Sequence, residues 1–164
     1  MTQPQTATAE TSLRETSLGD SGGNAEQAAA AVINRWYAAW NAHDPSALAA
    51  CLTADVVLEE PTGTYRGPDP ILEWARSVFR ASTDFELNML EAWTTPGGAV
   101  IATYWKATFT FTGPYEPLGL APTNGQIKLE GMDRNEIRDG RIARHQIFYD
   151  GADLAHQMGA EAVE

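Results

Sequence analysis

The chain has 164 residues, with 22 Asp or Glu against 11 Lys or Arg, which gives a formal net charge of −11 at pH 7. This acidic balance repels phosphate backbones and anionic lipid, so we expect no nucleic-acid partner and no membrane association. A single cysteine, Cys51, excludes an internal disulfide framework, and neither a secretory signal nor an apolar run of about 20 residues is visible, so we expect a soluble cytoplasmic protein.

Residues 1–23 are rich in Thr, Ser, Ala, Gln and Gly and contain few large apolar side chains. Such a segment buries too little surface to offset the entropy lost on ordering, so we expect a disordered N-terminal tail. A second, short flexible tail is expected at residues 160–164. A single domain over residues 24–159 remains.

Three helices are expected in the first part of this domain. Asn24 is a candidate cap for the first helix, whose apolar residues recur at helical spacing: Ile33, Trp36, Tyr37 and Trp40. Asp44 and Pro45 begin a second helix, and its buried side is formed by Leu48, Cys51 and Leu52. Asp69 and Pro70 begin a third helix, which continues through Ile71, Trp74, Ala75, Val78 and Phe79.

Strands dominate the rest of the chain. Residues 56–58 form a short strand that ends in a turn, and from residue 85 onward apolar residues alternate with polar ones. This pattern predicts strands over 85–93, 99–111, 126–138 and 141–150, with a tight turn at 139–140, a Pro/Gly-rich loop over 112–125 and a last short helix over 151–159. Helices first and hairpins later indicate an α+β fold, in which a mostly antiparallel sheet curves around the helices and encloses a pocket.

Four ionisable side chains fall on strand faces that otherwise point to the core. Glu60 and Asp133 alternate with apolar residues of their strands. Asp150 ends the last strand, and His145 shares a face of that strand with Ile147. A carboxyl group in an apolar pocket acquires a raised pKa, so it can donate a hydrogen bond as a neutral acid or remove a carbon-bound proton as a base.

Each of these residues also has a purely structural interpretation. Glu60 precedes a proline at a strand end, where it can face solvent, and Asp133 can bond a buried backbone amide. Asp150 can cap the last helix, and His145 can be a core histidine with satisfied hydrogen bonds. The sequence contains no phosphate-binding loop, metal-ligand spacing, nucleophile elbow or cofactor motif, so we expect neither a metal nor a cofactor.

Two segments of the sequence are similar to a known family. The segment "INRWYAAWNAHDPSALAACLTADVVLEEPTGTYRG" resembles the opening of the NTF2-like (cystatin-like) superfamily, which includes ketosteroid isomerases and SnoaL-like polyketide cyclases. The segment "LGLAPTNGQIKLEGMDRNEIRDGRIARHQIFYDGADLAHQMG" resembles the end of SnoaL-like members. The resemblance implies a cone, in which a curved, mixed but mostly antiparallel sheet wraps around the N-terminal helices.

The resemblance also assigns roles to residues. The catalytic base of the isomerases corresponds to Glu60. Their acid that donates a hydrogen bond to the enolate oxygen corresponds to Asp133. The isomerase tyrosine falls on Trp36, or on Tyr37 with a slip of one residue. In SnoaL-like cyclases and in limonene-epoxide-hydrolase-like proteins, the final-strand aspartate corresponds to Asp150.

The resulting expectation is an enzyme that performs general acid/base chemistry next to a carbonyl, by isomerisation or intramolecular aldol cyclisation of a polyketide-like or steroid-like substrate. Its catalytic candidates are Asp150, Asp133, Glu60 and His145. Its substrate-binding candidates are aromatic: Trp36, Tyr37, Trp40, Trp74, Trp105 and Tyr149.

Two alternatives stay open. One is water addition to an epoxide, although the stretch that should supply an Arg and a second Asp offers only Lys106. The other is a non-catalytic module that binds a ligand. We expect a homodimer by resemblance, and the candidate surface on strand 99–111 consists of Tyr104, Lys106, Thr108 and Thr110.

Overall fold

The structure is a computed structural model, and it describes residues 23–160. The two predicted tails lie outside the described residues, except for Gly23 and Ala160. The helices are α1 (Gly23–Asn41), α2 (Pro45–Ala50), α3 (Pro68–Ala81), the 3₁₀ helix η1 (Glu116–Leu118) and α4 (Gly151–Gln157). The strands are β1 (Leu52–Glu60), β2 (Gly63–Arg66), β3 (Glu86–Thr94), β4 (Val100–Thr110), β5 (Gln126–Arg138) and β6 (Arg141–Tyr149).

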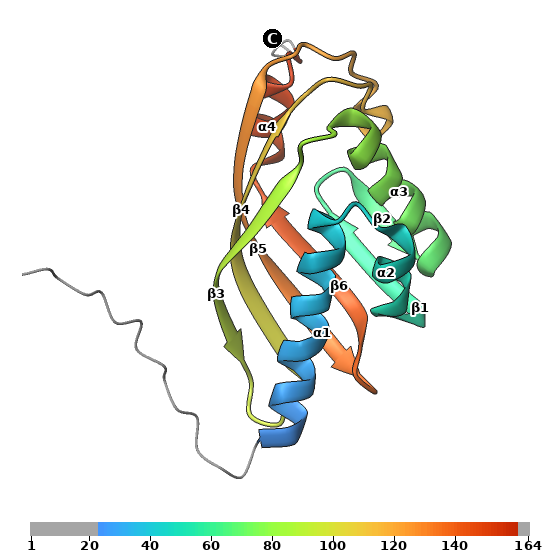
Figure 1. The fold of residues 1–164 in the computed structure, drawn as a ribbon, viewed down its shortest axis with the longest axis vertical. Helices are drawn as coiled ribbons and strands as arrows, with labels where there is room; N and C mark the ends of the chain where they lie inside the picture. The colour runs from blue at the N-terminus through green and yellow to red at the C-terminus, as the bar shows by residue number, and fades with distance from the viewer. Residues whose placement is uncertain (1–22, 161–164) are drawn as a thin grey trace, which may run out of the picture.

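The six strands form one sheet in the order β2-β1-β6-β5-β4-β3. Only β1 and β6 run parallel, and all other neighbours are antiparallel. The long strands curve, and α1, α2 and α3 lie on one side of the sheet, while α4 lies at one end of the molecule (Figure 1). The expected α+β cone, a curved and mostly antiparallel sheet around the N-terminal helices, is therefore confirmed.

Alternation along the strands decides what lies between the sheet and the helices. On β5 the even-numbered residues face outward, whereas Ile127, Gly131, Asp133 and Asn135 face inward and are buried. A tight turn joins β5 to β6 and pairs Arg138 with Arg141, because Asp139 (φ 51°) and Gly140 (φ 66°) both adopt the left-handed conformation of a tight hairpin. One bulge interrupts β6 near its start, so the inward set of β6 is Ile142, His145, Ile147 and Tyr149.

The observed helix bounds correct three expectations. Asn24 lies inside α1 and is not its cap. The carboxylate of Asp44 does accept hydrogen bonds from the backbone of Ser46 and Ala47, as expected, but α2 ends at Ala50, before the predicted buried residues 51 and 52. Helix α3 begins at Pro68 behind Gly67, whose φ of 80° is available to glycine without strain, so Asp69 does not cap it.

The segment after residue 51 also differs from the expectation. The predicted short strand is the nine-residue β1, which continues through a tight turn into β2. Strand β2 has only four residues and mixes polar with aromatic side chains, so its alternation is too short to detect.

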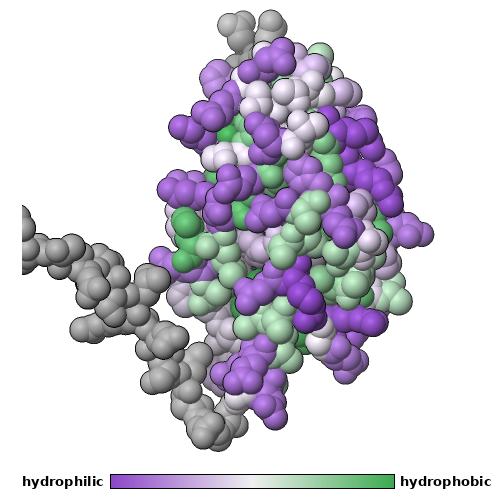
Figure 2. Space-filling model, viewed as in Figure 1, coloured by the Kyte–Doolittle hydropathy of each residue, from purple (hydrophilic) through white to green (hydrophobic). Residues whose placement is uncertain are grey.

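The surface of the helical side mixes hydrophilic residues with small hydrophobic patches (Figure 2). Within residues 23–160, no helix combines the length and the apolar character that crossing a membrane requires.

Candidate active site

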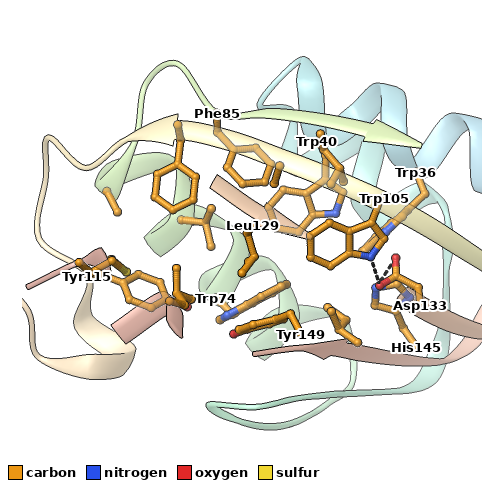
Figure 3. Close-up of a pocket in the computed structure, with 18 residues that line it drawn as sticks. Trp36, Trp40, Trp74, Phe85, Trp105, Tyr115, Leu129, Asp133, His145 and Tyr149 are labelled. Atoms are coloured by element: carbon orange, nitrogen blue, oxygen red, sulfur yellow. Dashed lines mark hydrogen bonds and ion pairs between the residues drawn. The ribbon is translucent and has the colours of Figure 1, made fainter. Parts of the chain in front are cut away.

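A cavity of about 90 Å³ lies inside the cone, with contributions from α1, α3, α4 and the inner face of the sheet. Most of its wall is aromatic or aliphatic (Figure 3). Five of the six predicted substrate-binding residues line it: Trp36, Trp40, Trp74, Trp105 and Tyr149. The sixth, Tyr37, does not line the cavity, but its hydroxyl donates a hydrogen bond to Asp133, which does.

Asp133 is the carboxyl group of this cavity. It comes from the inward face of β5 and is only 5% exposed. Its Oδ1 accepts a hydrogen bond from Trp105 Nε1 at 2.7 Å, and its Oδ2 accepts one from the Tyr37 hydroxyl at 3.3 Å. Burial raises the pKa of Asp133 from 3.8 to about 7, against the lowering effect of these donors. The side chain can therefore be either acid or base near neutral pH.

His145 lies beside Asp133 on the neighbouring strand. Its ring is 1% exposed, and its Nε2 is 3.8 Å from Asp133 Oδ2. Burial lowers the pKa of His145 from 6.5 to about 3, so the imidazole is neutral at pH 7.

Asn135 selects the tautomer of this histidine. The Asn135 amide nitrogen donates to the carbonyl of Ile101, so its oxygen is left to accept from His145 Nδ1. With the proton on Nδ1, the lone pair of Nε2 points toward Asp133. A neutral His145 therefore presents a proton acceptor at Nε2. Asn135 shares the inward face of β5 with Asp133, but no sequence pattern indicates its role, which depends on Ile101 and His145 of other strands.

Glu60 is buried, as expected, but it does not line the cavity. It lies at the end of β1, where its carboxylate accepts hydrogen bonds from Thr62, from the Tyr65 hydroxyl at 3.3 Å and from the Tyr149 hydroxyl at 2.8 Å. The structure thus places Glu60 behind a cavity-lining tyrosine, and does not bring it together with Asp133 at the cavity wall.

Asp150 caps helix α4, which is the structural role that the sequence offered as an alternative to catalysis. It is exposed, and its carboxylate accepts hydrogen bonds from the backbone of Ala152 and Asp153 at the start of α4. It does not line the cavity. Lys106 faces outward and pairs with Glu130, so the residues considered for epoxide hydrolysis are not gathered in the cavity. Strand parity could not place Asp150, because the residue follows the end of β6.

The sequence profile of the SnoaL-like domain matches residues 33–145. The chain belongs to the SnoaL-like domain family. The matched range includes both Asp133 and His145 and ends before Asp150. A comparison with curated protein sequences finds no match.

Solved structures share the fold of this SnoaL-like domain. A proposed SnoaL-like polyketide cyclase from Jannaschia sp. CCS1 superposes with a TM-score of 0.77 at 13% identity, covering 88% of this chain and 100% of that one. AclR, a proposed hydroxylase from Streptomyces galilaeus, gives 0.71 at 18% identity, covering 84% and 99%. A protein with a ketosteroid isomerase-like fold from Catenulispora acidiphila gives 0.66 at 18% identity, covering 79% and 93%. At these identities the likeness concerns the fold.

Proposed function

We propose that this SnoaL-like protein is a cofactor-independent enzyme that enolises a carbonyl compound, leading to isomerisation or to intramolecular aldol cyclisation. The observation that carries this proposal is the pair formed by Asp133 and His145 at the wall of an apolar cavity. Their environments push the two pKa values in opposite directions, so a neutral acid lies next to a neutral base. The polyketide cyclase named among the structural relatives supports the same class of chemistry.

The pair can carry out enolisation with balanced proton transfer. Asp133 in its acid form donates its proton to the substrate carbonyl oxygen. The Nε2 lone pair of His145 takes a proton from the neighbouring carbon, and the electrons of that C–H bond form the carbon–carbon double bond of the enol. The products of this step, a carboxylate and an imidazolium 3.8 Å apart, attract each other in a medium of low dielectric constant. In isomerisation the imidazolium gives its proton to the far carbon of a conjugated enol, whereas in cyclisation the enol carbon bonds a second carbonyl carbon, whose oxygen takes that proton. In both cases the Asp133 carboxylate takes back the enol O–H proton as the C=O bond re-forms.

The apolar wall supports this chemistry in two ways. It buries Asp133 and His145, which are 5% and 1% exposed, and this burial strengthens the electrostatic interaction between the developing charges. It also selects a substrate with apolar rings, since the side chains that surround Asp133 are tryptophans and other large apolar groups.

The test is deuterium exchange next to the carbonyl of 1-tetralone, a bicyclic ketone. In D₂O at pH 6, ¹H NMR should show protein-dependent loss of the signal from the CH₂ group beside the carbonyl. The Asp133→Asn variant should slow this exchange by a factor on the order of 10²–10³, because the developing enolate oxygen loses its proton donor. Asp150→Asn is the matched control, since that carboxylate lies outside the cavity, and it should exchange at the wild-type rate.

Three outcomes would contradict the proposal. They are a wild-type rate no faster than buffer, full exchange in Asp133→Asn, and a loss of exchange in Asp150→Asn equal to that in Asp133→Asn. Binding of 1-tetralone without exchange would instead identify a ligand-binding module.

We also propose that the chain forms a homodimer through the outer face of the sheet. Tyr104, Met132 and Phe148 lie in register across β4, β5 and β6, and Met132 and Phe148 are 43% and 56% exposed. An apolar row of this kind in the middle of a sheet is typical of an interface. Sedimentation velocity should give a dimer for the wild type and a monomer for Phe148→Glu; a monomeric wild type at micromolar concentration would refute this assignment.

A further inference from the structure

The cavity wall also contains a buried polar group outside the acid/base pair. The indole N–H of Trp74 lies at the cavity wall, on a residue that is 8% exposed, and no atom of residues 23–160 is its hydrogen-bond partner. In Figure 3, Tyr115 lies on the left, Trp74 and Tyr149 lie in the lower middle, and Asp133 and His145 lie on the right. An unpaired buried donor costs free energy comparable to a lost hydrogen bond, so this N–H requires an explanation.

The neighbouring hydroxyl groups do not satisfy Trp74. The Tyr149 hydroxyl donates to Glu60 at 2.8 Å. The Tyr115 hydroxyl is close enough to Trp74 for the indole N–H to lower the pKa of Tyr115, but the contact lacks hydrogen-bond geometry. Burial and the charge of Glu60 nevertheless give Tyr115 a raised pKa, so its hydroxyl stays protonated and can also donate.

Glu60 determines which ligand groups this end of the cavity accepts. Its negative charge raises the pKa values of both Tyr115 and Tyr149, and it would repel an anionic ligand group in the same way. The donors of Trp74 and Tyr115 therefore suit a neutral acceptor, such as the oxygen of a carbonyl, ether or hydroxyl group.

We propose that Trp74 and Tyr115 form a second ligand subsite, which binds a neutral oxygen at the end of the substrate opposite the reacting carbonyl. The substrate is then an apolar, ring-bearing molecule with oxygen functions at both ends. The reaction at one end of the substrate rests on the proposed function, whereas the subsite at the other end concerns binding alone. The interior of the cavity between the two ends contributes apolar contacts, such as those of Leu129 and Trp105.

Two matched bicyclic probes separate the two ends of the cavity. The first, 1-tetralone, has a carbonyl at one end, and 6-methoxy-1-tetralone adds an ether oxygen at the other. The readout is the ratio of the affinities for 6-methoxy-1-tetralone and 1-tetralone, measured by isothermal titration calorimetry. In the wild type the methoxy compound should bind about 3- to 10-fold more tightly, as expected for one net hydrogen bond.

The Trp74→Phe variant should reduce this ratio to about one, because it removes the N–H and keeps an aromatic ring. Phe85→Leu is the control, since Phe85 lines the same cavity without a polar atom; it should weaken both ketones and leave the ratio unchanged. If Trp74→Phe does not fold, Tyr115→Phe provides a second variant with a reduced ratio.

The subsite is refuted by a wild-type ratio of one or less, by a ratio that survives Trp74→Phe, or by absence of binding of the methoxy compound at millimolar concentration. Deuterium exchange recorded with the same ketones separates the two proposals. A normal ratio without exchange contradicts only the enolisation, and exchange without the ratio contradicts only the subsite.

Discussion

Asp133 and His145 should make opposite contributions to the pH dependence of the free energy of unfolding, so the two contributions cancel in the wild type. Substitution of either residue should reveal the contribution of the other. In the folded protein the pKa of Asp133 is about 7 and that of His145 is about 3, against ordinary values of 3.8 and 6.5. Between pH 3.8 and pH 6.5 the folded pair therefore holds one proton. The unfolded chain also holds one proton on these two residues, because there the carboxyl is ionised and the imidazole is protonated.

The free energy of unfolding depends on pH only where the folded and unfolded states bind different numbers of protons, by about 1.4 kcal/mol per pH unit for each proton. In Asp133→Asn the folded state has lost the pair's proton, while unfolded His145 still binds one, so stability rises with pH. In His145→Gln the folded Asp133 keeps its proton while the unfolded carboxyl has released it, so stability falls as pH rises. The wild type should show almost no slope from this pair.

Over two pH units inside this window, each variant should change by up to about 3 kcal/mol relative to the wild type, in opposite directions. Urea unfolding, followed by tryptophan fluorescence at about pH 4.5, 5.5 and 6.5, measures these differences. Exposed carboxylates titrate alike in all three proteins, so their contributions cancel when the wild-type free energy of unfolding is subtracted from that of each variant. The flat wild-type curve depends only on the total number of protons that the pair binds, whereas the slope of each variant reports the pKa of the group that remains.

Parallel stability curves for the three proteins, or slopes of the same sign for both variants, would refute this reasoning. They would mean that burial does not shift the two pKa values apart, and the acid/base assignment would lose its physical basis.

Three further substitutions test other parts of the site. Tyr37→Phe removes a hydrogen bond that lowers the pKa of Asp133, so the pH above which deuterium exchange declines should move upward; an unchanged or lower pH limit would contradict this. Gly131→Ala places a Cβ 2.4 Å from the Trp105 ring, and thermal unfolding should show a loss of about 1–3 kcal/mol together with weaker ketone binding. Asp150→Ala removes the α4 cap and should cost about 1 kcal/mol in urea unfolding without altering ketone affinity. Lost ketone binding in Asp150→Ala would return that residue to the active site.

Much of the fold was predictable because local patterns and tertiary structure agree. The α1 stripe of Trp36, Tyr37 and Trp40 is buried, and the alternation around Asp133 gives the inward and outward faces of β5 correctly. The four long strands lie within one residue of their predicted bounds. Strand β2 was missed because four residues contain too few alternations to form a pattern.

The candidate site was predictable only in part. Asp133 and His145 were found because an ionisable residue on an apolar face has a high cost unless a cavity or partner is present. Glu60 satisfied the same criterion, yet its carboxylate belongs to a hydrogen-bonded turn. Asp150 only adjoined residues that satisfied it, and its carboxylate caps a helix. The orienting role of Asn135 depends on a carbonyl of another strand, which no spacing within β5 reveals.

The sequence by itself determined the α+β class and the inward direction of Asp133, because periodicity and turn residues act over short distances along the chain, and the family was indicated by the resemblance of two of its segments. Only the tertiary structure decided which polar groups share the cavity. Asp133 meets Tyr37 across 96 residues and Trp105 across 28, and the proton affinity of its carboxyl depends on these partners and on the exclusion of water. Both are consequences of packing in three dimensions, so no local pattern contains them.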